Sequence, residues 1–98
     1  FYCVCYATSD SPLGDFVKYE GNPILVGDGK TVSGAGHHCI VFSPDKSRMI
    51  ILYHTHKKPG TIHPRVLAVG GIRFEEKGGK TVLVCDKPDT DFHKYPLD

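Results

Sequence analysis

The sequence shows no excess of charge of either sign and no long apolar run. Its 98 residues contain 12 lysines and arginines against 11 aspartates and glutamates, which gives a formal net charge of +1. A balance this close, without a basic run, leaves no electrostatic footprint for a nucleic acid or an anionic membrane surface. No apolar stretch approaches the ~20 residues that a helix needs to cross a bilayer. We therefore expect neither a nucleic acid nor a membrane as partner.

Helical periodicity is missing as well. The apolar runs are short, rich in Val, Ile, Tyr and Cys, and bounded by Gly, Pro, Asp and Ser, which is typical of strands. The sequence therefore predicts an all-β chain with strands at residues 1–8, 38–43, 48–54, 65–74 and 80–85. Residues 9–33 form a long connection, in which only residues 23–26 look like a strand.

The last four predicted strands follow one another through short turns, including the Gly78-Gly79 hairpin turn. Such a series predicts one antiparallel meander of the size of a propeller blade. The strand at residues 1–8 is then left over, and the chain begins with Phe1 instead of Met. We therefore expect a piece of a β-propeller, cut inside the preceding blade. An isolated sandwich is the alternative, although five strands are too few to close one well.

This reading makes residues 1–98 a single partial domain, with residues 86–98 as a surface tail. A propeller piece exposes strand edges and apolar faces that another chain can cover. We therefore expect a homo-oligomer or a strand-swapped assembly.

The four cysteines are predicted to be buried free thiols rather than a disulfide framework. Cys3 and Cys5 alternate on one predicted strand and point to the same face, a geometry that does not favour a bond between them. Cys39 and Cys85 lie within apolar runs. Free thiols favour a reducing compartment slightly, with a weak preference for the cytoplasm.

A glycine-rich turn at residues 33–36 leads into His37. Glycines let the backbone approach another group closely, and side chains at a junction between loop and strand are often aimed into a cleft. His37 is therefore a candidate ligand or substrate contact. The alternative is a histidine whose hydrogen bonds are satisfied by the neighbouring backbone of the turn.

His54 and His56 stand at positions i and i+2, so they share one face of a strand and can be considered as zinc ligands. A third ligand would have to come from His38 or His63. Because the spacing matches no structural zinc site, we favour the interpretation that His54 ends a strand and His56 begins a lysine-rich turn.

Four segments, taken in order, resemble the C-terminal third of glycoside hydrolase family 43. They are YATSDSPLGDF at residues 6–16, NPIL at 22–25, GAGHH at 34–38 and LYH at 52–54. The family patterns are A-S-x-S-x-x-G-P-F, N-P-I-L, G-x-G-H and Y-H, from which the sequence departs at Asp15 and at His38-Cys39.

The resemblance implies part of a five-bladed β-propeller: one antiparallel four-stranded blade and part of the preceding blade. It also implies an arabinofuranosidase or xylosidase that hydrolyses arabinose- or xylose-containing glycans with inversion. Inversion requires two carboxyl groups roughly 6.5–9.5 Å apart. In the family these lie upstream of the segment that matches residue 1. We therefore expect no catalytic residue within the chain, and no activity from the chain alone.

Three acidic residues of the long connection, Asp10, Asp15 and Glu20, are poor substitutes for those carboxylates, because a solvated loop acid has no reason to hold a raised pKa. The family resemblance instead assigns His37 to the central cavity, as a substrate contact and, in many members, as a contact to calcium or its waters. One imidazole alone makes a poor calcium site. Arg65 matches, loosely, an arginine that the final blade contributes to the substrate pocket; a solvated or ion-paired surface guanidinium is the alternative.

A second function remains open beside the hydrolase. The chain could be a non-catalytic β-module that binds carbohydrate or a protein partner through Tyr2, Tyr6, Tyr19 and Tyr53.

Overall fold

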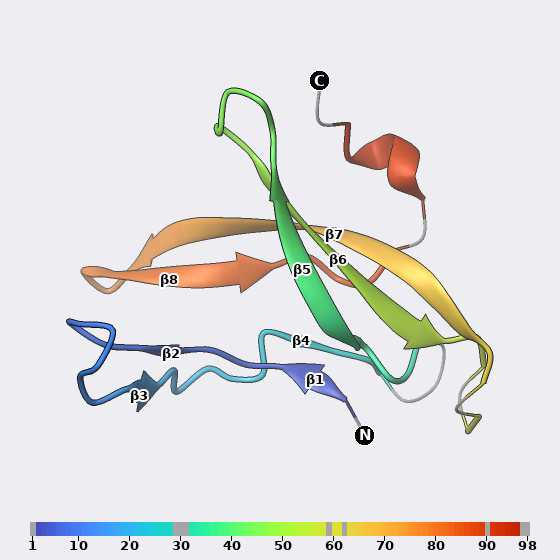
Figure 1. Cartoon of the computed structure of the whole chain (residues 1–98), viewed down its shortest axis with the longest axis horizontal. Coiled ribbons are helices and arrows are strands. Elements are labelled where there is room, and N and C mark those ends of the chain that lie inside the picture. Colours follow the sequence, from blue (N-terminus) through green and yellow to red (C-terminus); the bar gives the residue numbers. More distant parts are fainter. Residues whose placement is uncertain (1, 29–31, 59, 62, 90, 97–98) are drawn as a thin grey trace.

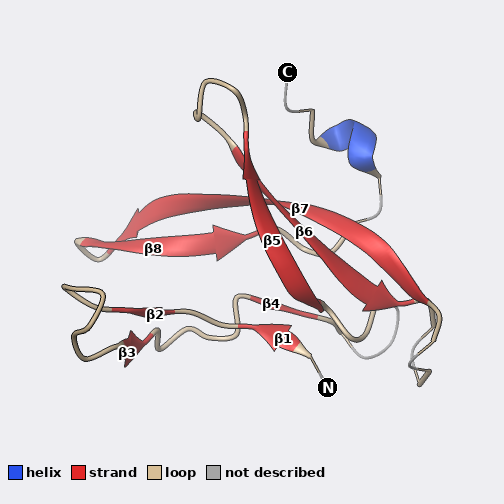
Figure 2. Cartoon of the chain, viewed as in Figure 1, coloured by secondary structure: helices blue, strands red, loops and turns tan. Residues whose placement is uncertain are grey.

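The computed structural model describes residues 2–28, 32–58, 60–61, 63–89 and 91–96. These residues form eight strands and one short 3-10 turn, η1 (Phe92–Lys94), so the predicted all-β class is confirmed (Figure 2). In this part of the chain, no helix is long and apolar enough to cross a membrane.

The C-terminal strands form one antiparallel sheet in the order β5 (Gly36–Phe42), β6 (Met49–His56), β7 (Arg65–Lys77) and β8 (Lys80–Cys85) (Figure 1). This is the predicted meander, in which each strand pairs with the next along the chain. β7 extends beyond residue 74, where the sequence predicted its end, because Glu75–Lys77 pairs with Lys80–Val82 across the hairpin turn.

The N-terminal part forms two smaller antiparallel sheets, so the single predicted strand at residues 1–8 is wrong in its extent. β1 (Cys3–Val4) pairs with β4 (Leu25–Val26), and β2 (Ala7–Thr8) pairs with β3 (Val17–Lys18). Phe1 lies outside the described residues.

An asparagine side chain explains why the N-terminal strand is interrupted. The Asn22 side chain accepts a hydrogen bond from the Tyr6 backbone N–H at 3.1 Å and donates one to the Tyr6 carbonyl at 2.8 Å. This amide satisfies the Tyr6 N–H in place of a neighbouring strand, and it shares the Tyr6 carbonyl with the Tyr19 backbone N–H, which donates at 3.0 Å. The chain on either side is therefore free to pair with different partners.

The sheet of β1 and β4 packs against the meander and shares a core with it, whereas β2 and β3 contribute no residue to that core (Figure 1). That core is formed by Val4, Leu25, Ala35, Ile51, Tyr53, Ala68 and Ile72. Alternating burial along β6 places Ile51 and Tyr53 in this core, as expected for a strand with one covered face. The Leu83 backbone N–H also donates to the Tyr6 hydroxyl at 3.2 Å. A four-stranded sheet with a partial second layer beside it is consistent with a piece of a β-propeller.

The cysteines are free thiols, but the prediction that they are buried is wrong. Cys3, Cys5 and Cys39 are exposed, and Cys85 is half-buried. Cys39 is exposed because β5 is an edge strand on which only Gly36 is buried. The apolar run around Cys39 therefore did not indicate a covered position.

The predicted tail runs along the edge and end of the meander. Asp89 pairs with Val69 through two backbone hydrogen bonds of 2.8 and 3.2 Å. Further along, the Arg48 side chain donates to the Pro96 carbonyl at 2.6 Å.

Candidate functional site

A β-bulge at the start of β5 sets the orientation of His37. Gly36 pairs with His54 and Cys39 pairs with Leu52, so two residues of β5 stand opposite Tyr53 alone. His37 has a φ of 52°, in the left-handed region that costs a non-glycine residue about 1–2 kcal/mol. Bulges re-aim side chains and occur often beside functional sites. The local backbone therefore holds His37 in an unfavourable conformation and leaves its side chain exposed.

The glycines before His37 allow two close approaches. A Cβ atom on Gly36 would lie 3.0 Å from the Cβ atom of Tyr2. A Cβ atom on Gly34, whose φ is +72°, would overlap the imidazole of His56. Glycine is therefore strongly favoured at Gly34 and allows a tight approach at Gly36, as the sequence predicted for this turn.

The start of β5, the end of β6 and the start of β7 lie close to β1 (Figure 1). Five side chains from these segments contact one another. We call them the His–Arg cluster: Tyr2, His37, His54, His56 and Arg65. The His37 and His54 rings lie nearly parallel, with centroids 6.1 Å apart and an interplanar angle of 22°. The Tyr2 ring meets His54 and His56 edge-on, at centroid distances of 5.3 and 6.2 Å.

Arg65 joins the two sides of the cluster. One guanidinium nitrogen, Nη1, lies 3.3 Å from His54 Nε2, and the other, Nη2, donates to the Tyr2 hydroxyl at 3.4 Å. The guanidinium carbon lies 5.3 Å from the Tyr2 ring centroid, within the range of a cation–π contact. Arg65 is itself exposed, so its side chain is held in place and still faces solvent.

The electrostatic environment of His54 disfavours its protonated form. Burial, and then the positive charge of Arg65, lower the pKa of His54 below its ordinary value. Because a guanidinium can only donate, His54 Nε2 must accept the hydrogen bond from Arg65. We therefore assign the neutral tautomer that carries its proton on Nδ1.

The structure brings the two predicted site residues together, since His37 and Arg65 both contact His54. His54 and His56 also belong to the cluster, which their strand-end interpretation did not anticipate. Their i, i+2 spacing was the available signal. Tyr2 could not be assigned by spacing, because it lies just before β1, outside the meander, and 63 residues before Arg65.

The His–Arg cluster does not fit a calcium or zinc ion by itself. Its members offer ring nitrogens, a phenol and a guanidinium, whereas calcium prefers carboxylate and carbonyl oxygens. Across the described residues, no group of three or more His, Cys, Asp or Glu side chains is placed to hold a metal ion. The zinc alternative for His54 and His56 therefore gains no third ligand from His38 or His63.

Several carboxylates elsewhere are engaged in structural contacts. Asp45 accepts hydrogen bonds from the Ser43 and Ser47 hydroxyls, both at 2.7 Å, and from the Ser47 backbone, and these bonds lower its pKa. Asp10, Asp15 and Glu20, the acids of the long connection, are exposed.

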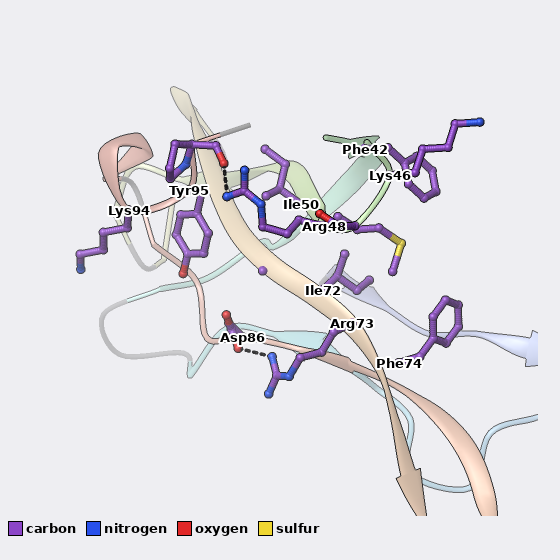
Figure 3. Close-up of a pocket in the computed structure, with 14 residues that line it drawn as sticks. Phe42, Lys46, Arg48, Ile50, Ile72, Arg73, Phe74, Asp86, Lys94 and Tyr95 are labelled. Atoms are coloured by element: carbon purple, nitrogen blue, oxygen red, sulfur yellow. Dashed lines mark hydrogen bonds and ion pairs between the residues drawn. The ribbon is translucent and has the colours of Figure 1, made fainter. Parts of the chain in front are cut away.

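A pocket of about 650 Å³ lies away from the cluster, at the opposite end of β5 and β6 (Figure 3). Its two arginines have partners within the chain. Arg73 pairs with Asp86 at 2.7 Å and with Glu75 at 2.6 Å, and Arg48 donates to the Pro96 carbonyl. Because these contacts tie the tail to the sheet, we assign this pocket a structural role and take the His–Arg cluster as the candidate site.

Among solved structures, the chain is similar to one described as the "crystal structure of a thermostable family-43 glycoside hydrolase". The TM-score is 0.75 and the sequence identity is 36%. The chain has a family-43-like fold. The similarity covers 92% of this chain and 28% of that structure, so the chain spans little more than a quarter of the length of its relative. No family model and no curated protein matches the sequence.

Proposed function

We propose that the chain is part of a family-43 glycoside hydrolase that cleaves arabinose- or xylose-containing glycans with inversion of configuration. The observation that carries this proposal is the similarity to the thermostable family-43 enzyme, at 36% identity over 92% of the chain. In this proposal β5–β8 form the last blade of a five-bladed propeller, and β1–β4 belong to the preceding blade.

His37 and Arg65 are the proposed substrate-binding residues. Arg65 donates to neutral His54 and to Tyr2, and these contacts fix the plane of its guanidinium. A guanidinium has five N–H donors, so others remain available to the hydroxyl oxygens of a sugar. The exposed ring of His37, set by the bulge, stacks on His54 and supplies a further hydrogen-bonding group.

Bond cleavage is proposed to depend on residues outside this chain. Inverting hydrolysis needs a carboxylic acid and a carboxylate on opposite faces of the sugar, and the His–Arg cluster contains neither. We propose that the oxygen ligands of a bound calcium ion also come from residues outside this chain. His37 would then contact the ion or its waters. We therefore expect the chain alone to bind sugar without cleaving it.

The alternative, a β-module that binds through four tyrosines, lacks a common aromatic surface. Tyr53 is only 2% exposed, which contradicts its proposed role in binding. Tyr6 and Tyr19 stack on each other with centroids 4.8 Å apart, whereas Tyr2 belongs to the His–Arg cluster.

Hydrolysis and binding assays on the 98-residue chain test the proposal. We expect no release of nitrophenol from aryl arabinofuranoside or aryl xyloside. We also expect arabinose or xylose oligosaccharides to shift the imidazole NMR signal of His37. His37→Ala and Arg65→Ala should weaken binding at least tenfold, or about 1.4 kcal/mol. His93→Ala is the matched control, because the side chain of His93 is 90% exposed on the tail.

Turnover well above background would contradict the assignment of the catalytic acids to residues outside the chain. Binding that survives in both cluster variants would contradict the roles of His37 and Arg65. The whole-enzyme proposal is tested by a chimera, in which this chain replaces the matching 28% of the thermostable family-43 enzyme. A chimera that folds, as judged by circular dichroism, and cleaves neither aryl glycoside would contradict that proposal.

We also propose that the isolated chain associates with itself along β5. This strand is at the edge of its sheet, and its side chains Ile40 and Phe42 are 39% and 53% exposed. An exposed apolar edge invites pairing with another copy. Light scattering should therefore detect dimers or larger species, and a stable monomer at high concentration would contradict the idea.

A further inference from the structure

We propose that Cys3 and Cys5 form an exposed dithiol that chelates one thiophilic divalent cation, such as Zn²⁺ or Cd²⁺. Both thiols are free and exposed, and their Sγ atoms lie 3.8 Å apart. This pair lies outside the His–Arg cluster and takes no part in the proposed function.

The separation of the two sulfur atoms matches what a tetrahedral metal centre needs. Zinc–thiolate bonds are about 2.3 Å long, so a tetrahedral angle between two of them places the sulfurs about 3.8 Å apart. Val4 lies between the two cysteines and is only 5% exposed, which directs both neighbouring thiols away from the core. A metal ion can therefore bridge the sulfurs without a rearrangement of the backbone.

The same backbone disfavours a disulfide between the two residues. A disulfide requires Cβ atoms about 3.5–4.5 Å apart, whereas alternate residues of an extended strand are separated by about 6.5–7 Å. The segment is held extended at both ends. Cys3 pairs with Val26, and the Val4 carbonyl accepts from the Ile24 N–H at 2.8 Å. Tyr6 is held by the Asn22 amide.

The surroundings leave room for the remaining ligands of the cation. Cys5 lines an open pocket of about 410 Å³ together with Lys18, Tyr19 and Asn22, so water molecules can complete the coordination. Binding is a proton–metal exchange in which each thiol loses a proton to the buffer as its sulfur–metal bond forms. No electron is transferred. Because protons are released, metal affinity should rise with pH.

Titration of the reduced chain with Cd²⁺ tests this proposal, since cadmium–thiolate bonds give a charge-transfer absorption in the ultraviolet. We expect saturation at one Cd²⁺ per chain and competition by Zn²⁺. Cys3→Ser and Cys5→Ser should each weaken binding at least tenfold. Cys39→Ser removes a different exposed thiol and should leave the affinity unchanged.

Phenylarsine oxide provides a second readout on the unmutated fold. It condenses with two neighbouring thiols and releases one water molecule, so mass spectrometry should detect a single adduct that maps to Cys3 and Cys5. The proposal would be overturned if the absorption band persisted in the Cys3→Ser variant, or if Cys39→Ser weakened binding equally. In a further test, the reduced chain is mixed with both oxidised glutathione and Cd²⁺. An internal Cys3–Cys5 disulfide formed in place of the cadmium complex would also overturn the proposal.

Discussion

Gly34 offers a direct test of how the His–Arg cluster is packed, because a single methyl group added there would enter the cluster. Its φ of +72° lies in the left-handed region, where alanine costs about 1–2 kcal/mol. Alanine also lowers the conformational entropy of the unfolded protein, and this effect offsets about 0.4–1 kcal/mol of that cost. The new methyl group would also lie 2.5 Å from the Cδ2 and Cε1 atoms of His56. Overpacking of this kind costs about 1–3 kcal/mol.

The imidazole of His56 would have to turn away from its edge-on contact with Tyr2 to avoid this overlap. Its backbone N–H donates to the Ser33 carbonyl at 2.8 Å, and its ring faces Tyr2. Gly78→Ala is the matched control, because Gly78 also has a positive φ, of +57°, and an added Cβ atom there would meet nothing within 4 Å. The control should therefore lose about 0–1.5 kcal/mol of unfolding free energy.

Urea denaturation of both variants measures the difference. We expect Gly34→Ala to be less stable than Gly78→Ala by about 1–3 kcal/mol, with an unchanged dependence on urea concentration. NMR should also show a shift of the His56 ring signals in Gly34→Ala alone. Equal losses in the two variants, within about 0.5 kcal/mol, would refute the close approach of Gly34 to His56.

Three further predictions concern single residues. His37→Gly should be more stable than His37→Ala by about 0.5–1 kcal/mol in the same urea assay, because both lack the ring but only glycine is relaxed at a φ of 52°; equal stability would contradict the strained bulge. The lowered pKa of His54 means that the unfolded chain binds a proton more readily, so stability should fall as pH decreases below about 6.5. Thermal unfolding should show a smaller fall in His54→Gln, and an identical fall would exclude this histidine as the cause. Burial raises the pKa of the Cys85 thiol to about 11, so its alkylation at about pH 8 should be slower than that of exposed Cys39, as followed by peptide mass spectrometry; similar rates would contradict that burial.

The C-terminal meander was predictable from sequence because its strands are long enough to show a pattern. In β6, burial alternates over several residues, and Gly78-Gly79 marks the turn into β8. β3 was missed because it consists only of Val17 and Lys18, both exposed, which leaves no alternation to detect. The break between β1 and β2 depends on Asn22, a contact across 16 residues that no local propensity encodes.

The candidate site was only partly predictable for a related reason. His37 could be found because the glycine-rich turn before it is a local signal. Its partners depend on strand register: β6 and β7 place His56 opposite Arg65, and the long turn at residues 57–64 leaves that register open when only the sequence is known. Tyr2 requires knowledge of how two separate sheets pack.

The N-terminal layer is attached to the meander through a small number of side chains, among them Val4, Leu25 and the Tyr6 hydroxyl. Its strands are two residues long, so we expect it to open as a separate cooperative unit before the meander unfolds. Such opening would remove Tyr2 from Arg65. The two proposed sugar-binding residues, His37 and Arg65, belong to the meander and would stay in place. If a sugar binds only the closed form, in which Tyr2 holds the Arg65 guanidinium, its apparent dissociation constant equals the intrinsic value divided by the closed fraction. Hydrogen exchange that is faster at Val4 than at Ile51, and slowed by bound sugar, would reveal this coupling; equal exchange at the two positions would exclude it.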